Sequence, residues 1–355
     1  MRVLLVTDTA EDLLPPIKLG DRLDEVSPRQ DVHTLRSIMN SQRITFETLA
    51  GATPWQIAGI AHAHEIEAIH ALGKVAAQHV AIAGRLVGIP TLATIYEPAK
   101  RLLTSGIEEW LVHLPALMKQ TIDRQIMGRG IDQIIAPTDL IRRDLIRASY
   151  PASRITVIYS GVDMETPVVP VDRGAMGLRD DAPLVAMIGD GDPGIEILLR
   201  VLPKLKMRIP DAQIVIVGGV ARDLLQRTNP ALPLRWMPRA DNLRGLIAAS
   251  DVVVHHTSRE GVPRAIMQAA AAGKPVVCSR VPGIVEIVKE GVTGLLVTPG
   301  DLNDFVIQIG RVLTQPRFAG ALGHAAREMA LAKFSYLAQS EATTITYEAT
   351  IYASR

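Results

Sequence analysis

The chain has few of the features of a secreted, membrane-spanning or nucleic-acid-binding protein. Of its 355 residues only Cys278 is a cysteine, so no disulfide can form within the chain and a disulfide-stapled fold is excluded. Lys and Arg number 38 against 37 Asp and Glu, a formal net charge of +1, so the basic excess typical of proteins that bind DNA or RNA is absent. Aromatic residues make up only 4%, so the apolar content must come from aliphatic side chains.

Long apolar runs are absent as well. No stretch approaches the roughly 20 consecutive apolar residues that span a bilayer as a helix. The first residues, 1–6, are followed by Asp8 and lack the long apolar core of a signal peptide. We therefore expect a cytoplasmic protein, for which peripheral contact with the inner face of a membrane stays open.

Short aliphatic runs make up most of the 48% hydrophobic content, and 355 residues exceed what one hydrophobic core usually organises. The runs alternate with segments of helical spacing, a pattern typical of parallel strands and their covering helices. In the first half this predicts strands at 3–7, 57–64, 91–96, 131–136 and 155–159. It predicts helices at 66–86, 107–127 and 139–148, and loops with one short helix at 11–42.

A segment rich in proline and glycine, 164–183, predicts a linker between two domains. Beyond it the alternation restarts, with strands predicted at 184–188, 213–217, 234–237, 252–255, 275–278 and 294–297. Helices are predicted at 195–207, 243–249, 263–272, 285–289 and 302–313. The fold class is therefore α/β, with two facing Rossmann-like domains whose ligands lie at the carboxyl ends of the strands.

One loop and helix, residues 259–272, carry the pattern most informative about chemistry. Glu260 precedes a helix whose first turn holds Pro263, a position that suits proline because its missing N–H has no intrahelical partner there. A helix start favours an anionic group, and we expect free backbone N–H groups there at Gly261, Val262 and Arg264. Gln268 lies eight residues after Glu260, about two turns along the same helix, and can reach the same ligand.

Residues 259–277, 282–288 and 291–297 resemble the nucleotide-sugar-binding domain of the family 4 retaining glycosyltransferases. Those enzymes have the GT-B fold, with the donor in the cleft between two Rossmann-like domains. Three further segments are similar to the family's pattern: 62–64 followed by 88–90, 157–163, and 334–336 before a final helix. The resemblance covers residues 55–352. It implies an acceptor domain at 1–166, a nucleotide-sugar domain at 167–335, and a helix at 336–355 that packs back on the first domain.

The resemblance also implies roles for single residues. Glu260 would contact the donor sugar, and Gln268 falls where the family has a second glutamate that binds the ribose. An amide oxygen accepts a hydrogen bond more weakly than a carboxylate does. Tyr96 falls where the family has a histidine near the reacting sugar, so we group it with Glu260 as catalytic. His62 and His64, on one face of a predicted strand end, are expected on the acceptor side.

Some family features are changed or missing. Where the family carries an Arg and a Lys that clamp the diphosphate, this chain has Gly189 and Asp190, followed by Asp192. Two unpaired acids beside a diphosphate would be unfavourable. The Gly-Gly loop that follows the family's first strand is absent from residues 8–19.

Other donor-side candidates have structural alternatives. Arg264 or Arg239 would replace the missing clamp, and Gly218, at a strand end, would approach the donor or only end the strand. Glu260 is alternatively a simple acid at a helix start. Asp190 and Asp192 would hold Mg²⁺ or, as we expect, form a solvated turn. The adjacent histidines at 255–256 lack further ligands at metal spacing, so no metal site is expected.

Together these features predict a retaining, hexosyltransferase-type glycosyltransferase that moves a sugar from a nucleoside-diphosphate sugar to a hydroxyl acceptor. The acceptor would be a glycan, a lipid-linked sugar or a small hydroxyl compound, and no separate cofactor or nucleic-acid partner is expected. The changed donor motifs leave a second hypothesis, a catalytically degenerate GT-B protein that acts as a partner or scaffold subunit. A different GT-B reaction, epimerisation or phosphorolysis, is the third. A protein partner or homo-oligomer stays open.

Overall fold

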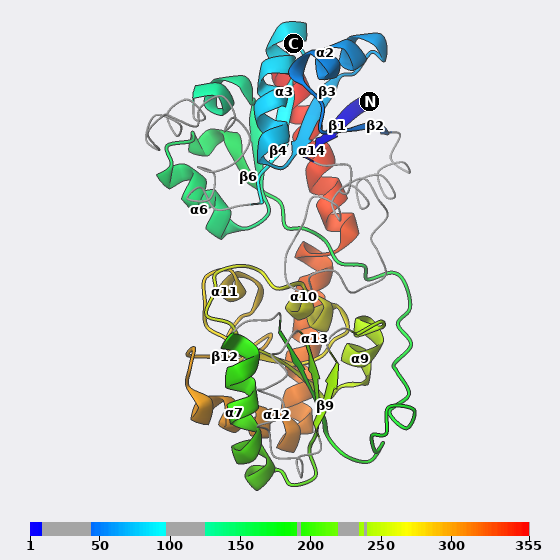
Figure 1. The fold of residues 1–355 in the computed structure, drawn as a ribbon, viewed down its shortest axis with the longest axis vertical. Helices are drawn as coiled ribbons and strands as arrows, with labels where there is room; N and C mark the ends of the chain where they lie inside the picture. Colours follow the sequence, from blue (N-terminus) through cyan, green and yellow to red (C-terminus); the bar gives the residue numbers. More distant parts are fainter. Residues whose placement is uncertain (9–43, 97–124, 190–192, 219–233, 238–239, 355) are drawn as a thin grey trace. The chain divides into compact units, whose positions relative to one another are not determined.

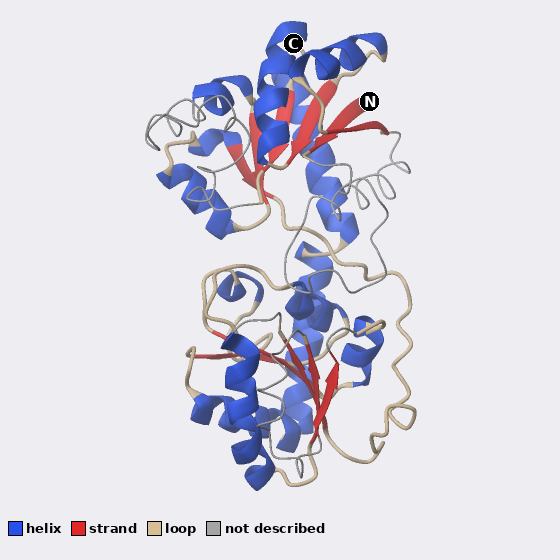
Figure 2. Cartoon of the chain, viewed as in Figure 1, coloured by secondary structure: helices blue, strands red, loops and turns tan. Residues whose placement is uncertain are grey.

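The computed structural model in Figure 1 describes residues 1–8, 44–96, 125–189, 193–218, 234–237 and 240–354. The described chain forms two compact units. The first contains the residues up to Gly161 and those from Tyr336 onward, and the second is Val162–Ser335. In each unit, helices pack on a parallel sheet (Figure 2).

The first unit is built on a six-stranded sheet with the order β2-β1-β3-β4-β5-β6. Its strands are β1 (Arg2–Thr7), β2 (Thr45–Ala50), β3 (Ala68–Leu72), β4 (Thr91–Thr94), β5 (Gln133–Ala136) and β6 (Ile155–Val157). Its helices are α2 (Pro54–Ala63), α3 (Lys74–Val87), α6 (Asp139–Arg147) and α14 (Tyr336–Ser354), with a 3-10 turn at Ala152–Arg154. Every residue of β1 after Arg2 is buried, as expected of a strand with structure on both faces.

The strand predicted at 57–64 is wrong, because this segment belongs to helix α2. The helix starts at a capping box in which Thr53 and Gln56 exchange hydrogen bonds, a strong local signal for helix initiation. Ile57 and Ala61, four residues apart, then lie buried on one helical face. The apolar run therefore follows the helical period rather than the alternation of a strand.

The single helix predicted at 66–86 is also wrong, because the segment is strand β3 followed by helix α3. Gly73 separates them with φ +108°, a conformation open to glycine that ends the strand sharply. Strand β2 was missed because it lies at the sheet edge, where its mixed residues, TFETLA, carry a weak apolar pattern. The predictions for 11–42 and 107–124 lie outside the described residues.

The second unit has a six-stranded parallel sheet with the order β12-β11-β10-β7-β8-β9. Its strands are β7 (Leu184–Ile188), β8 (Gln213–Val217), β9 (Leu234–Met237), β10 (Val252–His255), β11 (Val276–Ser279) and β12 (Leu295–Val297). Its helices are α7 (Pro193–Arg208), α9 (Leu243–Ala249), α10 (Arg264–Ala271), α11 (Ile284–Ile287), α12 (Leu302–Thr314) and α13 (Pro316–Lys333). The predicted elements of this unit are confirmed within about two residues. Helix α13 was not predicted.

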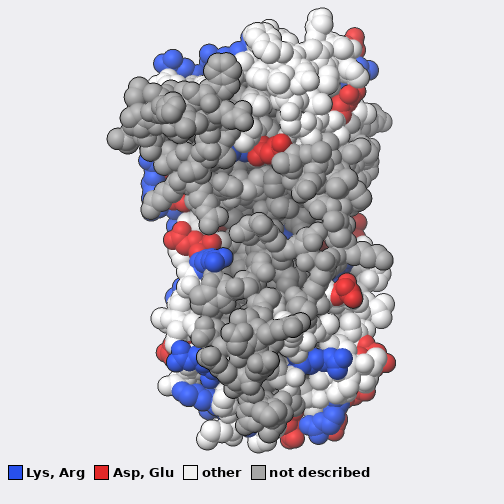
Figure 3. All heavy atoms as spheres, in the orientation of Figure 1, with Lys and Arg blue, Asp and Glu red and all other residues white. Residues whose placement is uncertain are grey.

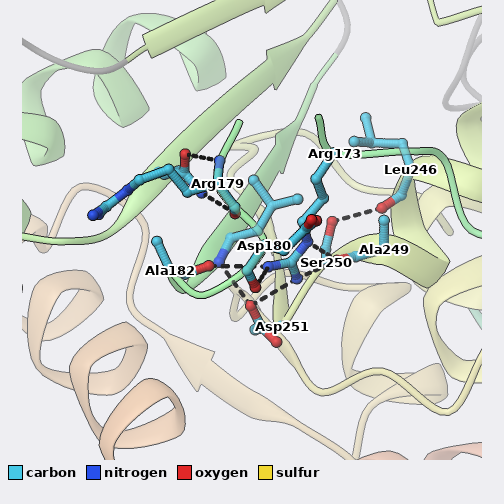
Figure 4. A network of polar contacts seen from close by, with 10 residues as sticks. Arg173, Arg179, Asp180, Ala182, Leu246, Ala249, Ser250 and Asp251 are labelled. Carbon is cyan, nitrogen blue, oxygen red and sulfur yellow. Dashed lines mark hydrogen bonds and ion pairs between the residues drawn. The ribbon is translucent and has the colours of Figure 1, made fainter. Parts of the chain in front are cut away.

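The segment that follows Val162 is fixed to the second unit by Arg173 (Figure 4). Its guanidinium pairs with Asp251 at 3.1 Å and donates to the carbonyls of Ala249 and Ala182. Asp251 in turn accepts the main-chain N–H of Leu184 at 2.7 Å, at the start of β7. The proline- and glycine-rich segment is therefore irregular in conformation but bonded to the unit it precedes.

Arg244 of α9 makes a second attachment. Its Nη1 lies 2.7 Å from Oδ2 of Asp163, and its Nη2 donates to the carbonyls of Asp163 and Thr166 at 3.2 and 3.0 Å. Burial raises the pKa of Asp163, but hydrogen bonds from Thr166 and the Arg244 guanidinium outweigh it and leave the pKa below its usual value. The carboxylate is therefore held in its charged form.

Helix α14 returns to the first unit, as the GT-B resemblance implies. Tyr347 is fully buried in the core beneath β1, and its hydroxyl lies 2.6 Å from Nδ1 of His70. The other ring nitrogen of His70 bonds to Thr94 at 2.8 Å, and burial lowers the histidine pKa to about 3. Gln339 accepts the N–H of Gly161 at 2.8 Å. These contacts join the C-terminal helix to the sheet through neutral, satisfied polar groups.

Candidate functional site

The order of the second sheet reverses between β7 and β10, since β8 and β9 follow β7 on one side and β11 and β12 follow β10 on the other. Ligands of open α/β sheets bind at such a point, at the carboxyl ends of the strands. The chain leaves β10 there and runs through residues 256–263 into α10. Thr257 donates to the hydroxyl of Ser279 at the end of β11, at 3.0 Å, which fixes the loop.

The loop packs tightly on residues 282–283. The N–H of Gly261 donates to the carbonyl of Pro282 at 3.1 Å, so the expectation that this amide is free for a ligand is wrong. A Cβ on Gly283, whose φ is +90°, would overlap the Gly261 carbonyl, so position 283 needs glycine for two reasons. At Gly261 an added Cβ would meet nothing within 4 Å, and glycine is favoured there by its φ of +147° alone. Pro263 is the N-cap residue of α10, with ψ 126°, rather than part of its first turn.

Glu260 and Gln268 stand on this loop and helix. The Glu260 side chain is exposed, and the described residues give it no hydrogen-bond or ion-pair partner. The Oε1 atom of Gln268 is buried and has no partner in the described part of the chain. Val262 and Arg264 are buried as whole residues, with exposed fractions of 6% and 7%.

Two buried histidines, which the sequence pattern suggested only as unlikely metal ligands, lie at the reversal point: His255 ends β10 and His256 follows it. His255 donates from Nδ1 to the carbonyl of Ile188 at the end of β7, at 2.7 Å. Burial, assisted by repulsion from a protonated His256 and opposed by the bond to Ile188, lowers the pKa of His255 to about 4. His256 is 2% exposed, accepts the N–H of Gly300 at 3.3 Å, and has its pKa lowered by burial. Both rings are therefore neutral near pH 7.

The other donor-side candidates follow β7, β8 and β9. Gly189 donates to the carbonyl of Val217, and Gly218, with φ +135°, donates to that of Met237, each at 3.0 Å. The Gly218 carbonyl accepts the indole N–H of Trp236 at 3.0 Å. These bonds close the strand ends. Asp190, Asp192 and Arg239 lie outside the described residues.

In the first unit, Tyr96 and Asp8 follow β4 and β1 and so lie at the carboxyl edge of the sheet. Tyr96 is half-buried. Asp8 Oδ1 accepts the N–H of Ala76 at 2.6 Å in the first turn of α3, where the helix dipole stabilises a carboxylate. Gly73 makes room for it, because a Cβ there would lie 2.5 Å from the carboxylate. An acid on a helix start thus follows the first strand, where the family has a Gly-Gly loop.

His62 and His64 lie at the end of α2 and not on a strand. The carbonyl of His64 accepts from the side chain of Arg2, the first residue of β1, at 3.1 Å, and its ring bonds to Glu47. This places them at the amino edge of the sheet. The structure therefore does not bring them together with Tyr96.

The charged and metal-binding residues of the described chain show no further site. No group of three or more His, Cys, Asp or Glu in the described ranges is placed to hold a metal ion. On the face shown in Figure 3, the described Lys and Arg side chains are scattered among Asp and Glu. No helix within the described ranges is long and apolar enough to cross a membrane.

Two Rossmann-like units, with a last helix that returns to the first, define the GT-B class of proteins. Family models agree with this: one for "Glycosyltransferase Family 4" matches residues 5–166, and one for "Glycosyl transferases group 1" matches residues 182–315. The two matches together cover most of both units. The chain belongs to the family 4 glycosyltransferases.

Known relatives are similar over part of their length. The chain is 29% identical over 216 residues to a sulfoquinovosyl transferase of Arabidopsis thaliana, covering 58% of this chain and 42% of that protein. It is 30% identical over 228 residues to a GDP-mannose-dependent alpha-(1-6)-phosphatidylinositol monomannoside mannosyltransferase of Mycolicibacterium smegmatis, covering 58% and 59%. The chain thus spans about half the length of these curated relatives.

A solved structure shares the fold over nearly the whole chain. The structure of Anabaena HepE in complex with UDP-glucose superposes with a TM-score of 0.71 at 18% identity, covering 98% of this chain and 99% of that one. At this identity the likeness shows the GT-B fold alone.

Proposed function

We propose that the chain is a retaining glycosyltransferase that uses a nucleoside-diphosphate sugar. The observation that carries the proposal is the pair of acceptor groups at the reversal point: the exposed carboxylate of Glu260 before α10, and the buried Gln268 Oε1, which has no partner in the described chain. Both are hydrogen-bond acceptors, which suits the hydroxyl groups of a sugar and a ribose. A structural neighbour binds UDP-glucose, and one relative depends on GDP-mannose, which supports a nucleotide sugar as donor.

The donor would lie across the second unit. Glu260 would hold the sugar and Gln268 the ribose. The main-chain N–H groups of Val262 and Arg264, at the start of α10, would meet a phosphate, because a helix N-terminus favours an anion. Gly261 is left out of this set, since its N–H already bonds to Pro282. Gly189, Gly218 and Pro263 are the remaining described donor-side positions, and Asp190 and Arg239, outside the described residues, stay candidates from the sequence.

The proposed mechanism needs no nucleophile from the protein. The leaving diphosphate assists the acceptor hydroxyl on the same face of the sugar, while the protein positions both reactants and stabilises the leaving charge. Tyr96, at the carboxyl edge of the first sheet, would serve the acceptor side. The acceptor is a glycan, a lipid-linked sugar or a small hydroxyl compound, and no cofactor beyond the nucleotide sugar takes part.

Calorimetric titration with UDP, GDP, ADP and dTDP sugars tests donor binding. Loss of one hydrogen bond, about 1 kcal/mol, should make Gln268→Ala bind the preferred donor roughly fivefold more weakly. Gln308→Ala is a matched control, because its Oε1 on α12 is also buried without a partner among the described residues. Binding of no nucleotide sugar would overturn the proposal and favour the partner-subunit alternative. NMR of the product's anomeric carbon tests retention, which an inverted product would contradict.

A further inference from the structure

His256 has half of its hydrogen-bonding capacity unused within the described chain. The ring is buried, and it packs on Phe305 of α12 with 5.4 Å between ring centroids. Nε2 accepts the N–H of Gly300 at 3.3 Å. Because a neutral imidazole has one donor and one acceptor nitrogen, the network assigns the proton to Nδ1. No described residue accepts a hydrogen bond from that nitrogen.

The other buried histidines differ from His256 in this respect. His255, the preceding residue, donates from Nδ1 to the Ile188 carbonyl. Both ring nitrogens of His70 have partners, Tyr347 and Thr94. A buried N–H without an acceptor destabilises a fold, so such groups are rare and call for an explanation. One explanation, which the fold class suggests, is that an oxygen atom of a bound ligand accepts this hydrogen bond.

The location of His256 indicates which ligand atom that is. It follows β10, whose neighbour is β7: Val254 pairs with Met187, so His256 lies level with the residue that follows β7. In open α/β sheets this is the reversal point where ligands bind. An uncharged N–H donor at this point suits an anionic oxygen.

We propose that Nδ1–H of His256 donates a hydrogen bond to a phosphate oxygen of the bound nucleoside diphosphate. The contact rests on the proposed function and adds a binding residue to it. Gly300 has a positioning role in this arrangement, since its N–H on Nε2 keeps the proton on Nδ1. Burial keeps the ring neutral, so the donor is present across the neutral pH range.

Two substitutions separate this role from a structural one. In His256→Asn the amide N–H stands in for Nδ1–H, while the contact with Gly300 is lost. In His256→Gln the amide oxygen can accept from Gly300 in place of Nε2, while the donor at the δ position is lost. We expect His256→Gln to weaken binding of the best-bound diphosphate among UDP, GDP, ADP and dTDP roughly 10- to 100-fold, as for a hydrogen bond to a charged group. The His256→Asn variant should retain most of the affinity for the diphosphate. Binding of the free nucleoside should be unchanged in both variants.

NMR of the ¹⁵N-labelled imidazoles gives an independent measurement. Adding the diphosphate should shift the Nδ1–H resonance of His256 and leave that of His70, in the other unit, in place. This inference alone would be overturned if the His256→Gln variant bound the diphosphate as tightly as the wild type does, or if it lost nucleoside and diphosphate affinity equally. The opposite ranking, in which His256→Asn binds the diphosphate weakly and His256→Gln binds it normally, would also overturn it, because His256 would then only anchor Gly300. Binding of none of the four diphosphates by the wild type would overturn the proposed function as well.

Discussion

Gly283→Ala tests whether the contact between residues 261 and 283 shapes the donor loop. Gly283 has φ +90° and ψ −56°, a conformation that only glycine adopts readily. A side chain there costs about 1–3 kcal/mol in backbone strain. Its Cβ would also lie 2.5 Å from the Gly261 carbonyl carbon, a backbone atom that cannot rotate away. Overpacking of this kind adds about 1–3 kcal/mol, so the expected destabilisation is about 2–6 kcal/mol.

Gly291→Ala is the matched control, because its φ is +69° but nothing lies within 4 Å of the added Cβ. It should cost about 1–2 kcal/mol, the strain of a left-handed alanine alone. Urea unfolding followed by tryptophan fluorescence measures the difference, since Trp236 of β9 reports on the second unit. Because Gly261 also bonds to Pro282, the shift should displace Glu260 and weaken nucleotide-sugar binding in the Gly283 variant only. Equal destabilisation by the two substitutions would refute the steric reasoning.

Three further predictions concern the remaining polar contacts and the thiol. Tyr347→Phe removes the buried bond to His70 and should lower the free energy of unfolding of the first unit by about 1 kcal/mol, measured in urea. Arg244→Met should reduce the stabilisation that the lowered pKa of Asp163 provides. Because that stabilisation is present above the unfolded pKa and lost as pH falls through the folded one, the difference in unfolding midpoint between the variant and the wild type should narrow below about pH 4, down to the part that comes from the bonds of Arg244 to two carbonyls. Cys278 is fully buried and burial raises its thiol pKa, so its alkylation rate should follow unfolding; fast labelling in native buffer would contradict this.

The second unit was predictable from the sequence because five of its six strands, all but β9, are fully buried and mostly apolar runs. Segments such as Val252–His255 are continuous apolar runs set off by turns, which local pattern identifies well. In the first unit the apolar run at 57–64 fits both the spacing of a helix and that of a buried strand. The capping pair Thr53 and Gln56 is the local signal that decides for a helix, and it lies just outside the run.

The helix that carries the candidate site residues was predictable from the sequence, but the contacts around it were not. The spacing of Glu260, Pro263 and Gln268 locates the helix start correctly, since all three are close in sequence. Which amides remain free depends on contacts made elsewhere in the chain, such as the bond from Gly261 to Pro282. The donor state of His256 depends on Gly300, 44 residues away. Pairings over such separations follow from tertiary packing and leave no local pattern.

The balanced charge of the chain is compatible with an anionic ligand once partial charges are counted. Four described arginines of the second unit are bonded to carboxylates, in the pairs Arg173–Asp251, Arg179–Asp211, Arg244–Asp163 and Arg280–Glu290. These cations hold the linker and a loop in place. Under the proposed function, the diphosphate would be met instead by the N–H groups at the start of α10 and by an imidazole. Such donors carry no formal charge, so they do not contribute to the net charge counted from the sequence. Their oriented dipoles nevertheless stabilise an anion at short range. A neutral donor is also less costly to bury than a cation without a counter-acid.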